Sequence, residues 1–368
     1  MKKKYKSKIE KKQKKNISED SELINKKVKR SYKEKESKNS KDIDNINNNY
    51  EFQSNPKNIK ISKNIIQDSA IFGEQNFACI IFKSIDNIFY IVYGTNRKSI
   101  VFYNLLDNKK IAAIKDAHLS YANYFRHILD EKNKRDLILS QNSGVQIINL
   151  KIWNVNTLEC TFNFQENLLG NIEPCFLNYQ HQIYIIINEG TSELIHVFDL
   201  EGNKVKQINN ISHFLKYIEC YHDLKTNKNF IIICNLDNII LYDYNADEIY
   251  HKFEEQNCFA FSIFNSKEMV KLIARSIDSI LIWNFHSKEL LKKLHINNIS
   301  IFCIWSEKYI MASDYINNTI YTINLDDGKK KNIISHGDSV VSLKKIIHPI
   351  YGECLLSQDK KGIIKISY

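Results

Sequence analysis

The most restrictive feature of the chain is a repeated pattern of short apolar runs, which is clearest in residues 136–164. Three strand-like runs lie there, at residues 136–140, 147–154 and 158–164, and polar turns separate them. Short strands joined by Gly, Asn, Asp and Ser are typical of an antiparallel meander. The segment therefore predicts a small unit of antiparallel strands.

The unit recurs along the chain with a nearly constant period. The end of each third strand carries a marker, which is an apolar residue, an aromatic residue and then Asn or Asp in all but the last two copies. The central marker residues are Tyr103, Trp153, Phe198, Tyr242, Trp283, Thr322 and Ser367. They lie 50, 45, 44, 41, 39 and 45 residues apart. Four strands in each of seven such repeats match the period of propeller blades, so we predict an all-β fold, a seven-bladed β-propeller of four-stranded antiparallel blades.

The composition of the strands supports this architecture and indicates how the ring closes. A blade buries both faces against its neighbours, so its strands alternate only weakly, as in residues 184–187 and 230–234. The last repeat contains only three strands before the chain reaches Tyr368. We expect residues 58–66, NIKISKNII, to supply the missing outer strand.

Two elements of the repeat indicate a family. Ile152-Trp153-Asn154 and Ile282-Trp283-Asn284 resemble a strand that ends in Trp-Asp, and Ala117-His118 and Ser335-His336-Gly337-Asp338 resemble a Gly-His element. On these residues the chain resembles the WD40-repeat β-propeller family, in particular protist WD-repeat proteins, over residues 58–368. The resemblance implies a non-catalytic scaffold that mediates protein–protein interactions through the propeller faces.

The resemblance also implies a buried network within a blade, made of Trp, Ser or Thr, His and an acid. His118, Ser140 and Trp153 match three of these positions, Asn142 is the candidate for the fourth, and Trp283 is the corresponding tryptophan of the fifth repeat. Buried polar groups need hydrogen-bond partners, and such a chain of donors and acceptors provides them. A Ser/His catalytic pair is the competing interpretation. No G-x-S-x-G surrounds Ser140, which argues against it.

No motif predicts a cofactor, a metal site or a catalytic residue. The eight cysteines are at least 14 residues apart, so they lack zinc-site spacing, and most lie among apolar residues. No phosphate-binding glycine motif occurs. Asp326-Asp327-Gly328 predicts a hairpin turn, since the ligand series of a calcium loop is absent.

One segment stands out as a candidate contact for partners. Ser120, Tyr121, Tyr124 and Arg126 lie where the chain enters the second repeat. Tyr and Arg are favoured at the centres of protein interfaces. The alternative is that Tyr124 and its neighbours are ordinary strand residues of that repeat.

The N-terminal part of the chain has a different composition. Residues 1–57 are rich in Lys and Asn and poor in large apolar residues, which predicts disorder. Residues 1–50 carry 17 Lys and Arg against 8 Asp and Glu, whereas the other 318 residues have a net charge of only +1. The neutral body does not favour nucleic acid. The basic cluster consists of Lys26, Lys27, Lys29 and Arg30.

The basic cluster leaves two interpretations. It is either part of a Lys-rich filler tail, or a signal for nuclear import or for contact with RNA or DNA. The second interpretation gives an alternative function, a nuclear or nucleolar factor whose tail contacts nucleic acid while the propeller binds a protein. With no secretory signal and no apolar run long enough to span a bilayer, we expect an intracellular, cytoplasmic protein, or a nuclear one if the basic cluster acts as an import signal.

Overall fold

The computed structural model describes residues 62–67, 79–95, 97–142, 148–166, 174–188, 193–209, 211, 215–235, 237–255, 257–348 and 350–368. The chain divides into two units, Met1–Ser54 and Asn55–Tyr368, and all described residues belong to the second. The predicted disordered tail, residues 1–57, and the basic cluster lie outside the described residues. Among the described residues every regular element is a strand, and no helix suited to crossing a membrane occurs.

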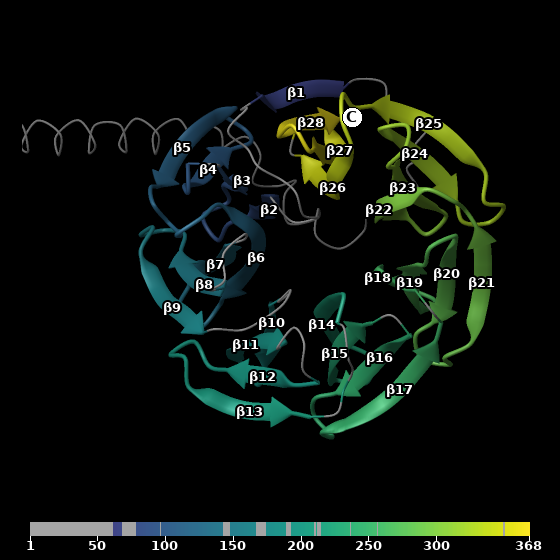
Figure 1. Ribbon diagram of the computed structural model, residues 1–368, viewed down its shortest axis with the longest axis horizontal. Coiled ribbons are helices and arrows are strands. Elements are labelled where there is room, and N and C mark those ends of the chain that lie inside the picture. Colours follow the sequence, from purple (N-terminus) through teal and green to yellow (C-terminus); the bar gives the residue numbers. More distant parts are fainter. Residues whose placement is uncertain are drawn as a thin grey trace, which may run out of the picture. The chain divides into compact units, whose positions relative to one another are not determined.

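The strands form seven sheets of four antiparallel strands each, arranged around a ring (Figure 1). This confirms the predicted fold class. We number the blades 1 to 7 in chain order from β2. The innermost strands are β2 Cys79–Lys83, β6 Ala122–Asp130, β10 Cys175–Tyr179, β14 Tyr217–Asp223, β18 Ala260–Asn265, β22 Ile299–Ser306 and β26 Val340–His348. The second strands are β3 Phe89–Gly94, β7 Arg135–Asn142, β11 Gln182–Asn188, β15 Lys228–Cys234, β19 Val270–Arg275, β23 Tyr309–Asp314 and β27 Gly352–Asp359.

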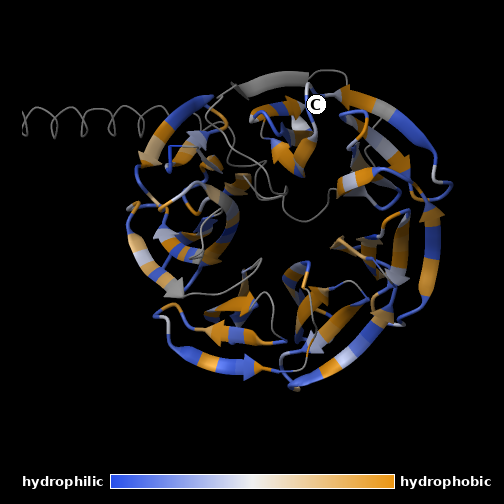
Figure 2. Ribbon diagram, viewed as in Figure 1, coloured by the Kyte–Doolittle hydropathy of each residue, from blue (hydrophilic) through white to orange (hydrophobic). Residues whose placement is uncertain are grey.

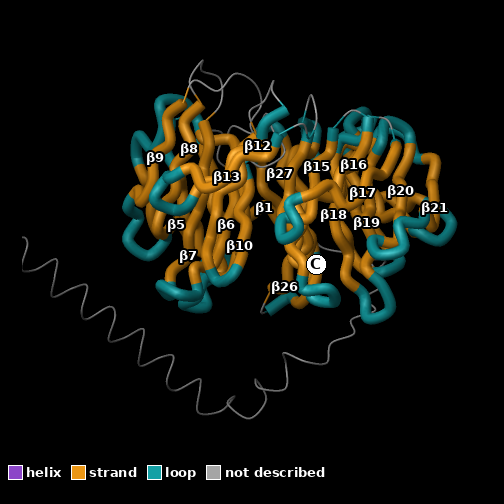
Figure 3. Tube along the Cα trace, turned by 90° about the horizontal axis from the view of Figure 1, so that it is seen from below, coloured by secondary structure: helices purple, strands orange, loops and turns teal. Residues whose placement is uncertain are grey.

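The third and fourth strands complete each blade toward the rim, and their connecting loops lie on the two faces of the ring (Figure 3). The third strands are β4 Ile100–Asn104, β8 Ile148–Asn154, β12 Ile195–Phe198, β16 Asn238–Asp243, β20 Ser279–Asn284, β24 Thr319–Asn324 and β28 Ile363–Ser367. The fourth strands are β5 Lys109–Ile114, β9 Cys160–Glu166, β13 Lys204–Ile208, β17 Glu248–Glu254, β21 Leu290–His295, β25 Lys330–Ser335 and β1 Ser62–Gln67.

Blade 7 joins the two ends of the propeller sequence. Its outer strand is β1, which pairs antiparallel with β28 so that Ser62 lies opposite Ser367 and Gln67 opposite Ile363. The register shifts by one residue between Asn64 and Ile66. The sequence predicted a closing strand at residues 58–66, and the strand observed at this place is Ser62–Gln67. The outer strand of the last blade therefore comes from the segment that precedes the first blade.

In blades 1 to 6, the Asn or Asp at the end of the third strand starts the hairpin into the fourth strand. Its side-chain oxygen accepts a backbone N–H two to four residues later, which is the geometry that gives these residues their preference for turns. The N–H···O pairs, at 2.7–3.0 Å, are Leu106 to Asn104, Asn156 to Asn154, Asn203 to Asp199, Asn245 to Asp243, His286 to Asn284 and Asp326 to Asn324. In blade 6 this turn shows that the marker is Thr322-Ile323-Asn324. The sequence interpretation, centred on Thr322, was wrong by one residue.

The core of the propeller lies between the blades. The described residues form seven apolar clusters, and each combines residues of two neighbouring blades. Ile91 and Ile366, for example, belong to the cluster between blades 1 and 7, whereas Phe102 and Phe125 belong to the cluster between blades 1 and 2. Figure 2 shows hydrophobic residues on the inner strands and hydrophilic stretches on rim strands such as β13. Each blade is therefore held by its two neighbours.

Asparagine occupies many of the turn positions that need a left-handed backbone. Of the described non-glycine residues with positive φ, six are asparagines: Asn87, Asn108, Asn227, Asn257, Asn298 and Asn318. Asn tolerates the left-handed region better than most residues.

The pairing of β1 with β28 predicts the effect of truncation. A chain that starts at residue 68 loses the outer strand of blade 7 and exposes the edge of β28, so we expect its Tm to fall by about 5 °C or more. A chain that starts at residue 51 keeps β1 and should melt like the full chain. Differential scanning calorimetry of the three proteins measures this. Equal melting temperatures for both truncations would refute the closure.

Candidate functional site

The buried network expected in blade 2 is present. Trp153 Nε1 donates to Ser140 Oγ at 2.7 Å, and His118 Nε2 lies 2.7 Å from the same oxygen. His118 Nδ1 lies 2.9 Å from Oδ1 of Asn149. The partners are satisfied if the Ser140 hydroxyl donates to Nε2 and Nδ1 carries the imidazole proton. The network ties the loop before β6 to β7 and β8.

Burial decides the protonation state of this network. His118 and Ser140 are buried. Burial, with the nearby charge of Lys151, lowers the pKa of His118 from 6.5 to about 4. The imidazole is therefore neutral near pH 7. Because Ser140 has no exposed surface, the pair has no access to a substrate, and its geometry is that of internal bracing.

The acid position of the network was predicted wrongly. Asn149, on β8, holds the place opposite His118 that the sequence assigned to Asn142. Asn142 instead accepts the backbone N–H of Asn149 at 2.6 Å, so it supports the residue that contacts the imidazole. Asn142 is the last residue of β7, and its side chain reaches the backbone at the start of β8.

Among the described residues, no equivalent network surrounds Trp283 of blade 5. Trp153 pairs with Ile138, and Ser140 follows two residues later. Trp283 pairs with Leu272, and the residue two positions later is Ala274. No hydroxyl is available at that place. Trp283 packs in the apolar cluster of blades 4 and 5, with its ring 5.2 Å from that of Phe253.

A second network, which the sequence analysis missed, lies in blade 7. His336 Nε2 lies 2.8 Å from Ser357 Oγ, and His336 Nδ1 lies 3.3 Å from Asp359 Oδ2. All three residues are buried. Burial lowers the pKa of His336, and the hydrogen bond that its ring donates to Asp359 opposes this shift. The signal was the spacing: the serine follows the histidine by 21 residues here and by 22 in blade 2. Ser367 at the marker position hid the match.

Two of the four predicted contact residues are used within the ring. Tyr124 is buried and donates its hydroxyl to the Pro174 carbonyl at 2.8 Å. The Arg126 guanidinium lies 4.9 Å from the Tyr124 ring centre and 3.4 Å from the Glu219 carboxylate of blade 4. Tyr217 donates to the same carboxylate at 2.8 Å.

The other two predicted contact residues lie outside strand β6. Ser120 and Tyr121 are half-buried in the loop before β6. The four residues thus do not form one exposed patch. Tyr124 and Arg126 are strand residues of β6, in line with the alternative interpretation of the sequence.

Polar contacts also join neighbouring blades through the turn after the marker. His286 Nε2 lies 3.0 Å from Asp223 Oδ2 of blade 4, and Asn156 donates to Asp86 of blade 1 at 2.9 Å. Burial raises the pKa of Asp223, but hydrogen bonds from Thr226 and His286 outweigh it and hold the pKa below its usual range. In blades 2 and 5, the residue two positions after the marker therefore bridges to the preceding blade.

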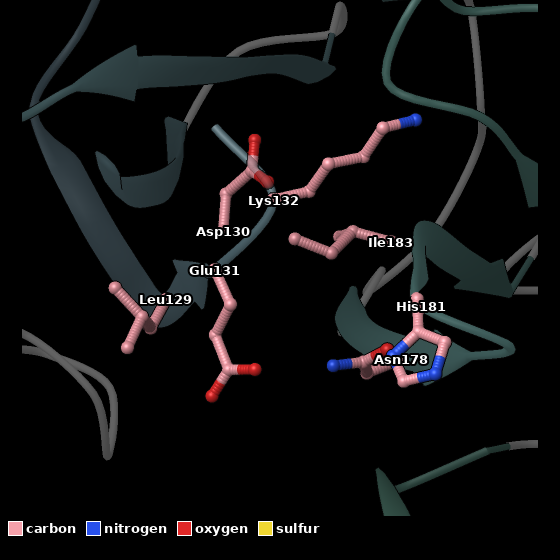
Figure 4. A pocket seen from close by; sticks show the side chains of 7 residues that line it. All are labelled: Leu129, Asp130, Glu131, Lys132, Asn178, His181 and Ile183. Carbon is pink, nitrogen blue, oxygen red and sulfur yellow. The ribbon is translucent and has the colours of Figure 1, made fainter. Parts of the chain in front are cut away.

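Two of the clefts among the described residues lie between blades. The smaller, about 310 Å³, is lined by residues of the β6–β7 and β10–β11 turns, among them Glu131, Lys132, Asn178 and His181 (Figure 4). The larger, about 520 Å³, lies between blades 4 and 5 beside Asp223 and His286. Small-molecule sites are mostly apolar, whereas the smaller cleft is lined mainly by charged and polar side chains.

The described residues contain no cluster of three or more His, Cys, Asp or Glu side chains that could hold a metal ion. All eight cysteines are free thiols, and Cys160 is exposed while five others are buried. Asp327 accepts the N–H of Lys329 at 3.0 Å in the turn between β24 and β25, as predicted for a hairpin.

The comparisons with known proteins identify the fold alone. No protein-family model matches the chain, and no curated protein matches it by sequence. Among solved structures, the one described as the crystal structure of BBS1N in complex with ARL6DN, soaked with mercury, has a TM-score of 0.61 at 10% sequence identity. The match covers 84% of this chain and 95% of that chain. The chain is thus similar in fold to a β-propeller.

The blade 2 network predicts the cost of losing its central hydroxyl. Ser140→Ala leaves the buried N–H of Trp153 and a ring nitrogen of His118 without their partner, so we expect a loss of about 2–4 kcal/mol in the free energy of unfolding. Urea unfolding measures it. Ser287→Ala, at an exposed position of blade 5, is the control. Equal midpoints for the two variants would contradict the bracing role.

The low pKa of His118 predicts a pH dependence. The unfolded imidazole titrates near 6.5 and the folded one near 4, so between these values the unfolded state binds more protons and stability falls as pH falls. The contribution of His118, about 3 kcal/mol, is complete above pH 6.5 and lost by pH 4. His118→Gln should flatten the plot of unfolding free energy against pH in this window. An unchanged slope would refute the assignment.

Proposed function

We propose that this protein is a non-catalytic, WD40-like propeller that binds proteins or peptides through the loops on its faces. The observation that carries this proposal is where the most exposed apolar side chains lie. Leu224 is 83% exposed and Ile350 is 72% exposed, and both lie in turns between strands. Leu119, Ile277 and Ile316 also lie in such connections and are about 60% exposed.

The hairpin between β26 and β27 is the strongest candidate contact. Ile347 and Ile350 lie close together in sequence, and both side chains are about 70% exposed. The adjacent ring of Tyr351 stacks on Tyr368 with centres 4.1 Å apart, which holds the hairpin in place. Exposed apolar groups that lie together mark interaction sites more often than scattered ones do.

Further support comes from the fold and from the described side chains. A propeller of the same fold is recorded in complex with ARL6DN, so the architecture is compatible with a protein partner. Ser140 and His118 are hydrogen-bonded to each other inside the blade, which supports a bracing role for this pair over a catalytic one. We place the protein inside the cell, in the cytoplasm.

Affinity purification with the full chain as bait tests the proposal. We expect Ile347→Ser combined with Ile350→Ser to reduce recovery of the specific partners at least tenfold. Each substitution removes an apolar side chain that the partner would cover in the complex. Ile111→Ser with Leu290→Ser, at positions of the rim strands that are about 45% exposed, is the control. Equal recovery by both double variants would refute this hairpin, and turnover of generic hydrolase substrates by the purified protein would refute the non-catalytic assignment.

A second function is favoured by one observation, the net charge of +9 in residues 1–50. In that case the tail contacts RNA or DNA in the nucleus while the propeller binds a protein. Deletion of residues 1–50 would then reduce nucleic-acid binding and nuclear localisation, and the salt dependence of binding would fall with it. Unchanged binding and localisation would leave the scaffold function alone.

A further inference from the structure

Two cysteines from different blades lie in contact. The sulfur of Cys175 is 3.3 Å from the sulfur of Cys220, although 45 residues separate them in sequence. Cys175 is the first residue of β10 in blade 3, and Cys220 lies on β14 in blade 4. These inner strands belong to different sheets and meet by packing in the cluster between the two blades. A bond between the sulfurs would therefore be a covalent link between blades.

Contacts to a third strand, β6, fix both cysteines. The Tyr124 hydroxyl holds the carbonyl of Pro174, the residue before Cys175. The Arg126 guanidinium pairs with Glu219, the residue before Cys220. The two thiols are thus placed by the contacts of neighbouring residues, and their proximity is part of the packing of blades 2, 3 and 4.

The two thiols differ in access. Cys175 is 1% exposed, within the apolar cluster. Cys220 is partly exposed. An oxidant that reaches the site therefore meets Cys220 first, and Cys175 is positioned behind it as the second thiol. The charged groups that act electrostatically on Cys220 are Glu219, its neighbour on β14, and Arg126 from β6.

We propose that Cys175 and Cys220 form a reversible disulfide between blades 3 and 4 when the protein meets a hydroperoxide. The Cys220 thiolate attacks a peroxide oxygen, the O–O bond breaks, and the leaving oxygen takes up the thiol proton, which gives a sulfenic acid and water or an alcohol. The Cys175 sulfur then attacks the Cys220 sulfur, the S–O bond breaks, and hydroxide leaves as water with the Cys175 proton. Two thiols and one hydroperoxide thus give one disulfide, one water and one further water or alcohol.

Burial sets the rate of this reaction. Burial, followed by the contact with Cys175, raises the pKa of Cys220 well above its usual value. Since the thiolate is the nucleophile, oxidation is slow at neutral pH and accelerates as the pH rises. The link closes a long loop of the chain, so it restricts the unfolded state and stabilises the ring.

Peptide mapping of the full chain tests the proposal. The reduced protein is treated with excess hydrogen peroxide, alkylated after unfolding and digested without reduction. We expect a peptide pair joined through Cys175 and Cys220, with a mass about 2 Da below the sum of the two thiol peptides. The Tm should rise by about 5 °C. A thiol reductant should reverse both changes.

Two variants separate the pair from other cysteines. Cys175→Ser should abolish the linked peptides and leave a sulfenic acid on Cys220 that dimedone traps. Cys303→Ser removes another partly exposed thiol on an inner strand and should keep the link. The proposal is overturned if Cys175 and Cys220 remain alkylatable under conditions that oxidise the exposed Cys160. The wild-type map decides this even where a variant fails to fold.

Discussion

The burial of both faces of every blade is the constraint on which the rest of the structure depends. Each four-stranded sheet has two apolar faces, and each face is covered only by the next blade. The seven apolar clusters lie at the seven boundaries between blades. Apolar burial stabilises the fold in proportion to the area removed from water. An open array of blades would leave two apolar faces exposed to water. The packing of blade 7 against blade 1 covers both of these faces at once.

Apolar packing is non-directional, and polar contacts fix particular residues within it. The networks centred on His118 and His336 join loops to strands in blades 2 and 7, where an unpaired buried group would destabilise the fold. Contacts such as His286 with Asp223 fix one blade against the preceding blade. Apolar burial thus holds the blades together, and the hydrogen bonds determine their register.

Strand β6 has a special place in the ring. Phe125 is fully buried toward blade 1, Tyr124 reaches the segment before blade 3, and Arg126 reaches Glu219 of blade 4. The Tyr and Arg side chains of β6, which are residue types favoured at protein interfaces, therefore make contacts within the propeller. The residues that remain for partners are the exposed apolar ones of the turns, such as Ile350. The pairing of Cys175 with Cys220 lies in the region that β6 organises.

The sequence by itself determined the period, the number of blades and the direction of each strand, because these follow from the spacing of apolar runs and of turn residues along the chain. It also located His118, Ser140 and Trp153, since the hydrogen-bonding residue types lie at spacings set by the repeat. Only the tertiary structure decided which side chains meet across blades. Asn149 holds the position beside His118 that the sequence assigned to Asn142. Ala274 offers no hydroxyl to Trp283. Tyr124 and Arg126 proved to be internal, and Cys175 met Cys220. Contacts of this kind depend on the packing of sheets that are distant in sequence, and a one-residue change of register moves a side chain to the other face.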